Sequence, residues 1–142
     1  MNSAKALDVW VVDDDASIRW VLERALKQAG LETRAFEHAD AALAALRQGA
    51  PDVLVTDIRM PGRSGLEMLE EIRAKRPRLP VIVMTAHSDL ESAVAAYQGG
   101  AFEYLPKPFD IDQAVELVRR AATQVQRSET TATDSRRIPE ML

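Results

Sequence analysis

Four short apolar segments of this 142-residue chain are each followed by polar side chains that could do chemistry. The segments are 9–12, 53–56, 81–84 and 103–105, and the polar residues that follow them are Asp13, Asp14 and Asp15, then Asp57, then Thr85, then Lys107. An aspartate in such a position is commonly a turn former or a helix cap. Taken together, these residues supply three kinds of group that can act on phosphate or a metal ion: carboxylates, a hydroxyl and an ammonium.

The elements that must position these residues alternate along the chain. The four apolar segments are β-branched and suit strands that are buried on both faces, whereas residues 32–36 are more polar and favour an edge strand. Apolar residues with helical spacing follow each strand and form five stripes, each on one face of a predicted helix. The first four stripes end at Gly30, near 49–51, before Pro77 and at 99–100, and the fifth covers residues 111–122. Asp15 is expected to cap the helix that begins near Ala16.

This alternation predicts an α/β fold: a single five-stranded parallel sheet, doubly wound as (βα)5, with helices on both faces. In such a sheet, sites form at the carboxyl ends of the strands. Residues 1–125 are predicted to form this domain. Residues 126–142 lack an apolar stripe and are predicted to be a flexible linker toward a further domain of a longer parent chain.

The predicted cluster needs positive charge. Asp13, Asp14 and Asp57 in proximity would repel one another and raise their pKa values. A hard divalent cation that leaves positions for water and phosphate oxygens relieves this repulsion, which favours Mg²⁺. Lys107 would supply a second positive charge. A plain salt bridge from Lys107 to Asp57 is the simpler interpretation, and it is compatible with a switch in which the lysine moves to phosphate oxygens.

The composition and the absence of several known motifs exclude some classes of function. The chain has no cysteine and a net charge of −4, which fits a cytoplasmic protein and makes direct nucleic-acid binding unlikely for this segment. No apolar run is long enough to span a membrane. Neither a Walker A loop nor a GxGxxG motif follows the first strand, and no Ser/His/Asp triad or cysteine nucleophile is available. These absences argue against a nucleotide-binding site and against a triad hydrolase.

Four motifs in the right order carry a family resemblance. Residues 11–15 (VVDDD), 57–62 (DIRMPG), 85–86 (TA) and 107–108 (KP) together resemble the receiver domain of two-component response regulators, over about residues 7–125. Longer stretches look like the nitrogen-regulation regulators of the NtrC group, which activate sigma-54 RNA polymerase; these stretches are 10–15, 17–23, 85–90 and 104–112. The resemblance implies a flavodoxin-like, CheY-like fold and a regulatory domain, not an enzyme, that catalyses only its own phosphoryl transfer and dephosphorylation.

The resemblance also implies a role for each matching residue. Asp57 matches the phosphoacceptor, and Asp14, Asp57 and the backbone carbonyl of Arg59 match direct Mg²⁺ ligands. Asp13 matches the second acidic residue, which acts through water. The remaining matches are Lys107 for the lysine that pairs with phosphoryl oxygens, Thr85 for the hydroxyl that turns inward, and Tyr104 for the aromatic switch residue. The Lys107–Pro108 bond is expected to be cis.

The implied partners are a sensor histidine kinase, a downstream ATPase domain of the parent chain and a second copy of the phosphorylated receiver. We expect the inward movement of Thr85 to free space for Tyr104 and so to shift the helix over residues 90–97, which would form the output surface. Arg59 and His87 either flank the phosphoryl group and tune its lifetime or are solvated surface residues.

Two other functions fit parts of the pattern. A Mg²⁺-dependent phosphohydrolase could use Asp13 as its nucleophile, with Asp15 completing an Asp-x-Asp pair, but the chain lacks room for a cap domain. A flavodoxin-like electron carrier would share the fold. Its phosphate loop would need serine, threonine or glycine after the first strand, where this chain has aspartates.

Overall fold

The structure is a computed structural model, and it describes residues 7–86 and 89–130. Strands and helices alternate along this part of the chain, as the sequence predicts: β1 (Asp8–Val12), α1 (Ala16–Gln28), β2 (Glu32–Phe36), α2 (Ala39–Leu46), β3 (Val53–Asp57), α3 (Gly65–Lys75), β4 (Val81–Ala86), α4 (Leu90–Gln98), β5 (Glu103–Lys107) and α5 (Ile111–Thr130).

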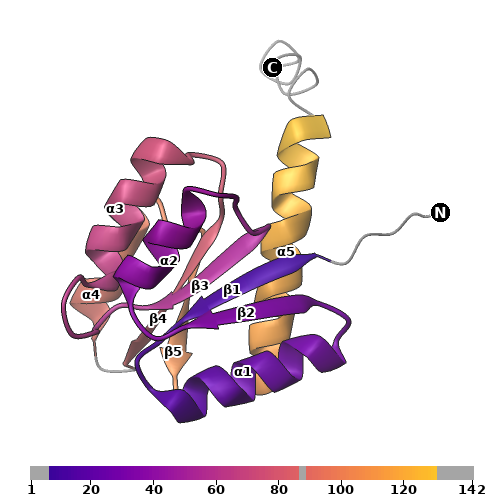
Figure 1. Ribbon diagram of the computed structural model, residues 1–142, viewed down its shortest axis with the longest axis horizontal. Coiled ribbons are helices and arrows are strands. Elements are labelled where there is room, and N and C mark those ends of the chain that lie inside the picture. Colours follow the sequence, from indigo (N-terminus) through magenta and orange to yellow (C-terminus); the bar gives the residue numbers. More distant parts are fainter. Residues whose placement is uncertain (1–6, 87–88, 131–142) are drawn as a thin grey trace, which may run out of the picture.

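The strands form one parallel sheet in the order β2-β1-β3-β4-β5 (Figure 1). The more polar strand β2 lies at an edge, as predicted. The chain steps from β1 to β2 on one side and then returns past β1 to β3 on the other, so the direction of winding reverses between β1 and β3. In open α/β sheets this reversal opens a crevice at the carboxyl ends of the two strands. Asp13 and Asp57 stand at these ends.

Two apolar layers cover the two faces of the sheet, with α1 and α5 on one face and α2, α3 and α4 on the other (Figure 1). Side chains of β1 alternate between the layers, as the period of two in a strand requires. Val9 and Val11 pack with Leu22 and Leu26 of α1. Trp10 and Val12 belong to the layer under α2 and α3.

Helix ends follow local sequence signals. Asp15 caps α1, and its carboxylate accepts hydrogen bonds from the backbone N–H groups of Ser17 and Ile18. At the other end of α1, Gly30 has a φ of 88° and donates to the Lys27 carbonyl, a C-terminal motif that favours glycine. Both helix ends agree with the sequence prediction.

Helix α5 is longer than the sequence predicts. It runs to Thr130, so its last five residues fall in the segment assigned to the linker. Residues 131–142 lie outside the described part of the chain, and a flexible linker there stays a prediction. Among the residues described, no helix is both long and apolar enough to cross a membrane.

The burial of α1 gives a stability prediction. Leu26 is fully buried between α1 and the sheet, so Leu26→Ala removes packed methyl groups and should lower the free energy of unfolding by about 2–5 kcal/mol. Leu90→Ala makes the same change at a side chain that is 67% exposed, and should cost less than about 0.5 kcal/mol. Urea denaturation measures both. Equal losses in the two variants would contradict this account of the core.

Candidate functional site

Three carboxylates meet at the crevice between β1 and β3. Oxygen atoms of Asp13, Asp14 and Asp57 all lie within 4.8 Å of one another. The sequence predicts this convergence, because both strands end at the same edge of the sheet. Asp15 stands apart from the cluster because its carboxylate is used by the α1 cap.

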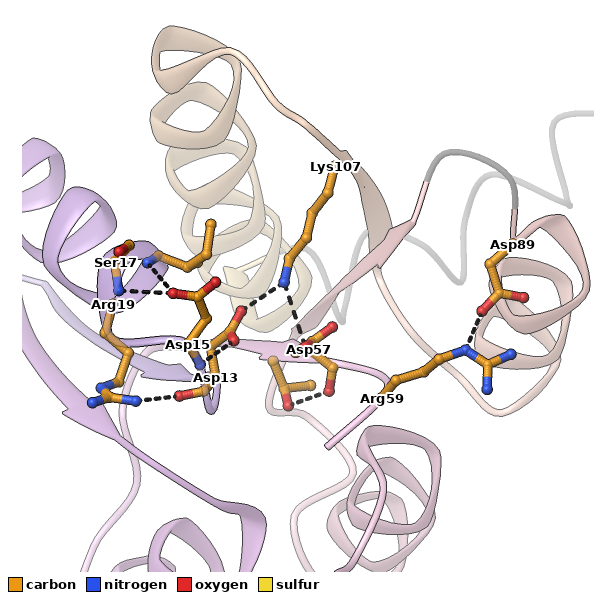
Figure 2. Close-up of polar contacts among 10 residues, drawn as sticks. Asp13, Asp15, Ser17, Arg19, Asp57, Arg59, Asp89 and Lys107 are labelled. Atoms are coloured by element: carbon orange, nitrogen blue, oxygen red, sulfur yellow. Dashed lines mark hydrogen bonds and ion pairs between the residues drawn. The ribbon is translucent and has the colours of Figure 1, made fainter. Parts of the chain in front are cut away.

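Asp13 is fixed in place by hydrogen bonds to both of its oxygens (Figure 2). Its side chain is fully buried; Oδ1 accepts from the backbone N–H of Asp15 at 2.9 Å, and Oδ2 accepts from Lys107 Nζ at 2.9 Å. Its backbone carbonyl accepts from Arg19 of α1 at 2.8 Å. Asp13 is therefore a rigid anionic anchor for the site.

Lys107 lies between two carboxylates. Its ammonium is 2.9 Å from Asp13 Oδ2 and 3.4 Å from Asp57 Oδ2 (Figure 2). The expected salt bridge to Asp57 is present, but the hydrogen bond is to Asp13. Lys107 is the last residue of β5, and its bond to Pro108 is cis, as expected.

Burial and two neighbouring charged side chains set the pKa of Asp57. Burial is the largest effect and raises it, and the charge of Asp13 raises it further; Lys107 lowers it, but the net pKa lies above the ordinary value of 3.8. For Lys107, burial is again the largest effect and lowers the pKa. Bonding and charge from Asp13, with Asp57, outweigh burial, so the pKa of Lys107 is raised. The site is therefore deficient in positive charge.

The two predicted switch residues lie on the neighbouring strands. Thr85 of β4 is almost fully buried and follows Met84, the residue that pairs with Asp57. Tyr104 of β5 is partly buried, and its ring packs edge-on against the ring of Tyr97 on α4, with centroids 5.6 Å apart. A contact chain from β5 to α4 therefore exists.

Arg59 does not turn toward Asp57. Its side chain is 74% exposed, and its Nε donates to Asp89 Oδ2 at 2.8 Å (Figure 2). Asp89 caps α4. The sequence analysis missed this residue, although an aspartate directly before a helical stripe is a cap signal. His87 lies outside the described residues.

Gly65 is a second residue that the sequence analysis missed. A Cβ atom at this position would overlap the backbone carbonyl oxygen of Asp57, and the Gly65 N–H donates to the Ile58 carbonyl at 2.8 Å. The start of α3 thus rests directly on the backbone of the site. Ser64 and Glu67 form a capping box there, and the Ser-x-x-Glu spacing was a readable signal.

The carboxylate cluster fits a hard divalent cation. Its donors are oxygen atoms from two strands, and Asp14 is exposed while Asp57 is partly exposed, so water and phosphate oxygens could complete the coordination. The raised pKa of Asp57 is what an added cation would reverse. Mg²⁺ suits such an arrangement because it usually keeps several waters.

A comparison with known protein families shows to which family this chain belongs. The response regulator receiver domain model matches residues 9–119. The chain belongs to the response regulator receiver family. The fold prediction is thereby confirmed, because solved members of the family share the CheY-like, flavodoxin-like sheet.

Within this family, the receiver is similar to regulators of the NtrC type. It is 64% identical over 118 residues to the DNA-binding transcriptional regulator NtrC of Salmonella typhimurium, and equally to that of Escherichia coli; each alignment covers 83% of this chain and 25% of the relative. The chain thus spans about a quarter of the length of these relatives.

Similarity to solved structures supports the same family assignment. The apo receiver domain of nitrogen regulatory protein C is 63% identical, with a TM-score of 0.77 over 84% of this chain and 97% of that chain. NtrX from Brucella abortus, solved with ADP, is 35% identical, with a TM-score of 0.86 over 90% of this chain and 30% of that chain. This chain is thus an NtrC-type receiver domain, a regulatory module.

The raised pKa of Asp57 predicts that Asp57→Asn stabilises the receiver at neutral pH. A raised pKa in the folded state means that stability falls as pH rises from 3.8 through the raised value, because the ionised carboxylate is disfavoured there. Removing this charge should raise the free energy of unfolding at pH 7, and the gain should be modest because the Asp57 side chain keeps some contact with water and Lys107 already offsets part of the charge. Below pH 3.8 the difference should shrink toward zero.

Urea denaturation in EDTA over a range of pH measures this effect, and Glu70→Gln, at an exposed carboxylate outside the carboxylate cluster, is the control. A destabilised Asp57→Asn variant at pH 7 would contradict the electrostatic account.

Proposed function

We propose that this receiver is a phosphorylation switch in which Asp57 takes a phosphoryl group from a phosphohistidine of a sensor histidine kinase, with the help of Mg²⁺. One observation carries the proposal: Asp57 is partly exposed, lies beside the Lys107 ammonium and shares a cluster with two further carboxylates. A nucleophilic carboxylate needs access to its substrate, and charge neutralisation must be at hand.

The transfer balances as a displacement at phosphorus. An oxygen of Asp57 attacks, the bond from phosphorus to the imidazole nitrogen breaks, and the imidazole leaves with the electron pair. Lys107 can turn from Asp13 and Asp57 toward the phosphoryl oxygens and offset their charge. Asp14, Asp57 and the backbone carbonyl of Arg59 would hold Mg²⁺, with Asp13 acting through water. When bound, Mg²⁺ supplies further charge neutralisation at the transferred group.

The alternative phosphohydrolase would use Asp13 as its nucleophile. Both oxygens of Asp13 already accept hydrogen bonds and its side chain is fully buried, so an attack on phosphorus would first have to break the bond to Lys107. This geometry favours Asp57.

The acyl phosphate adds about −1.5 to −2 of charge at the end of β3. Thr85 can gain a hydrogen bond by turning toward it, and Tyr104 can then move inward and pull on Tyr97. Among the described residues of α4, the buried ones are the small Ala93 and Ala96, so this helix resists movement weakly. A bias of a few kcal/mol is enough for such a switch.

The output of the switch lies in the parent chain. We propose that α4 acts on a downstream ATPase domain, that phosphorylation allows two receivers to pair, and that the parent protein activates transcription in nitrogen regulation. The support is the relatives, which are named DNA-binding transcriptional regulators and are about four times as long as the matched segment.

Intact-mass measurement after incubation with acetyl phosphate and Mg²⁺ tests the phosphoacceptor. We expect one phosphoryl group on the wild type, none on Asp57→Asn and none on the wild type in EDTA. Uptake by both proteins would move the chemistry to another aspartate and contradict the assignment. Uptake by neither would contradict phosphorylation from a small donor.

Thr85→Ala should uncouple phosphorylation from α4. In the wild type, beryllofluoride with Mg²⁺ should change amide hydrogen exchange across residues 89–100, and Thr85→Ala should lose most of that change while still binding the mimic. Thr123→Ala, at an exposed position on α5, is the control and should behave as the wild type. An unchanged response in Thr85→Ala would refute the role of this hydroxyl, and no response in the wild type would refute the movement of α4.

A further inference from the structure

One carboxylate joins the start of α4 to the loop that follows Asp57. Asp89 Oδ2 accepts from Arg59 Nε at 2.8 Å, and Asp89 Oδ1 accepts from the backbone N–H of Ser92 at 3.3 Å (Figure 2 draws the first contact). The Asp89 side chain is only 13% exposed, whereas Arg59 is 74% exposed. The acceptor is therefore held by the fold, and the donor is free to leave.

This contact matters because the side chain that α4 buries in its first turns, that of Ala93, is small. Its large apolar side chains, Leu90, Val94 and Tyr97, are exposed. Its last turn is anchored differently, since a Cβ atom at Gly99 would press on Leu69 of α3. The helix is thus packed closely at its end and tied at its start by a polar contact.

The loop places Arg59 two residues after the phosphoacceptor. We propose that the Arg59–Asp89 ion pair positions α4 in the resting receiver, and that a phosphoryl group on Asp57 opens this pair by competing for the guanidinium. The proposal deepens the proposed function and rests on it. Arg59 and Asp89 are then positioning residues of the switch.

Electrostatics support the competition. The side chain of Arg59 lowers the pKa of Asp89 through their hydrogen bond, so the pair attracts in the resting state. A phosphoryl group offers more charge than a carboxylate and several acceptor oxygens, which guanidinium groups bind well. The resting pair is exposed to water on the arginine side and is therefore weak enough to break.

The same loop supplies a matched control. Arg63 also forms an ion pair of comparable length, 2.9 Å to Asp40, and a second contact to Glu71. These partners lie on α2 and α3, so losing the Arg63 side chain removes a loop ion pair without touching α4.

The resting state is tested by amide hydrogen exchange on the unphosphorylated chain. Arg59→Ala should speed exchange in the first turns of α4 by about two- to fivefold, the range expected for an exposed ion pair. Arg63→Ala should leave α4 unchanged. Asp89→Asn keeps a good helix cap but loses the charge, and Arg59→Ala should add nothing in that background. Wild-type exchange rates in Arg59→Ala, or full additivity with Asp89→Asn, would overturn the proposal.

The opening step is tested on the same proteins with acetyl phosphate and Mg²⁺, with intact mass read alongside exchange. In the wild type, exchange in the first turns of α4 should rise on phosphorylation; in Arg59→Ala the further rise should be smaller, because the pair is already absent. An equal rise at equal phosphoryl content would overturn the proposal while leaving the phosphoacceptor intact. Loss of phosphoryl uptake would instead count against the proposed function itself, so the two failures are distinguishable.

Discussion

The charge imbalance at the ends of β1 and β3 is the constraint around which the candidate site is built. Within residues 7–86 and 89–130, three carboxylates share this crevice with one ion-paired ammonium, that of Lys107. Burial and the negative charge of Asp13 raise the pKa of Asp57, so the site has too little positive charge. A divalent cation, or a lysine that moves closer, would supply the missing charge. A site in this condition is electrostatically suited to a divalent cation. It also costs the resting domain some stability, as functional sites commonly do.

Much of this arrangement could be predicted from the sequence because it follows from short-range rules. The β-branched runs specify buried parallel strands, the polar β2 specifies an edge, and Asp15 and Gly30 bound α1 through their local hydrogen bonds. Once the strands are parallel, their carboxyl ends must converge, so Asp13, Asp14 and Asp57 come together without further information.

What the sequence could not specify depends on side-chain direction and close backbone approach. Lys107 hydrogen-bonds Asp13 rather than Asp57, and Arg59 turns to Asp89, because the paths of β5 and of the loop after β3 fix these directions. Gly65 is needed because α3 begins against the Asp57 carbonyl, a contact between residues whose spacing gives no hint of it. Helix α5 continues through residues 126–130 to Thr130, where the sequence has no apolar stripe that would predict a helix.

If Asp13, Asp14 and Asp57 form a cation site, a Mg²⁺ titration followed by backbone amide NMR should detect it. We expect saturable shifts confined to the ends of β1 and β3, around these three residues, and their loss in Asp14→Ala. Shifts that are absent at these positions, or that centre on other acidic surfaces such as Glu67 and Glu71, would contradict it.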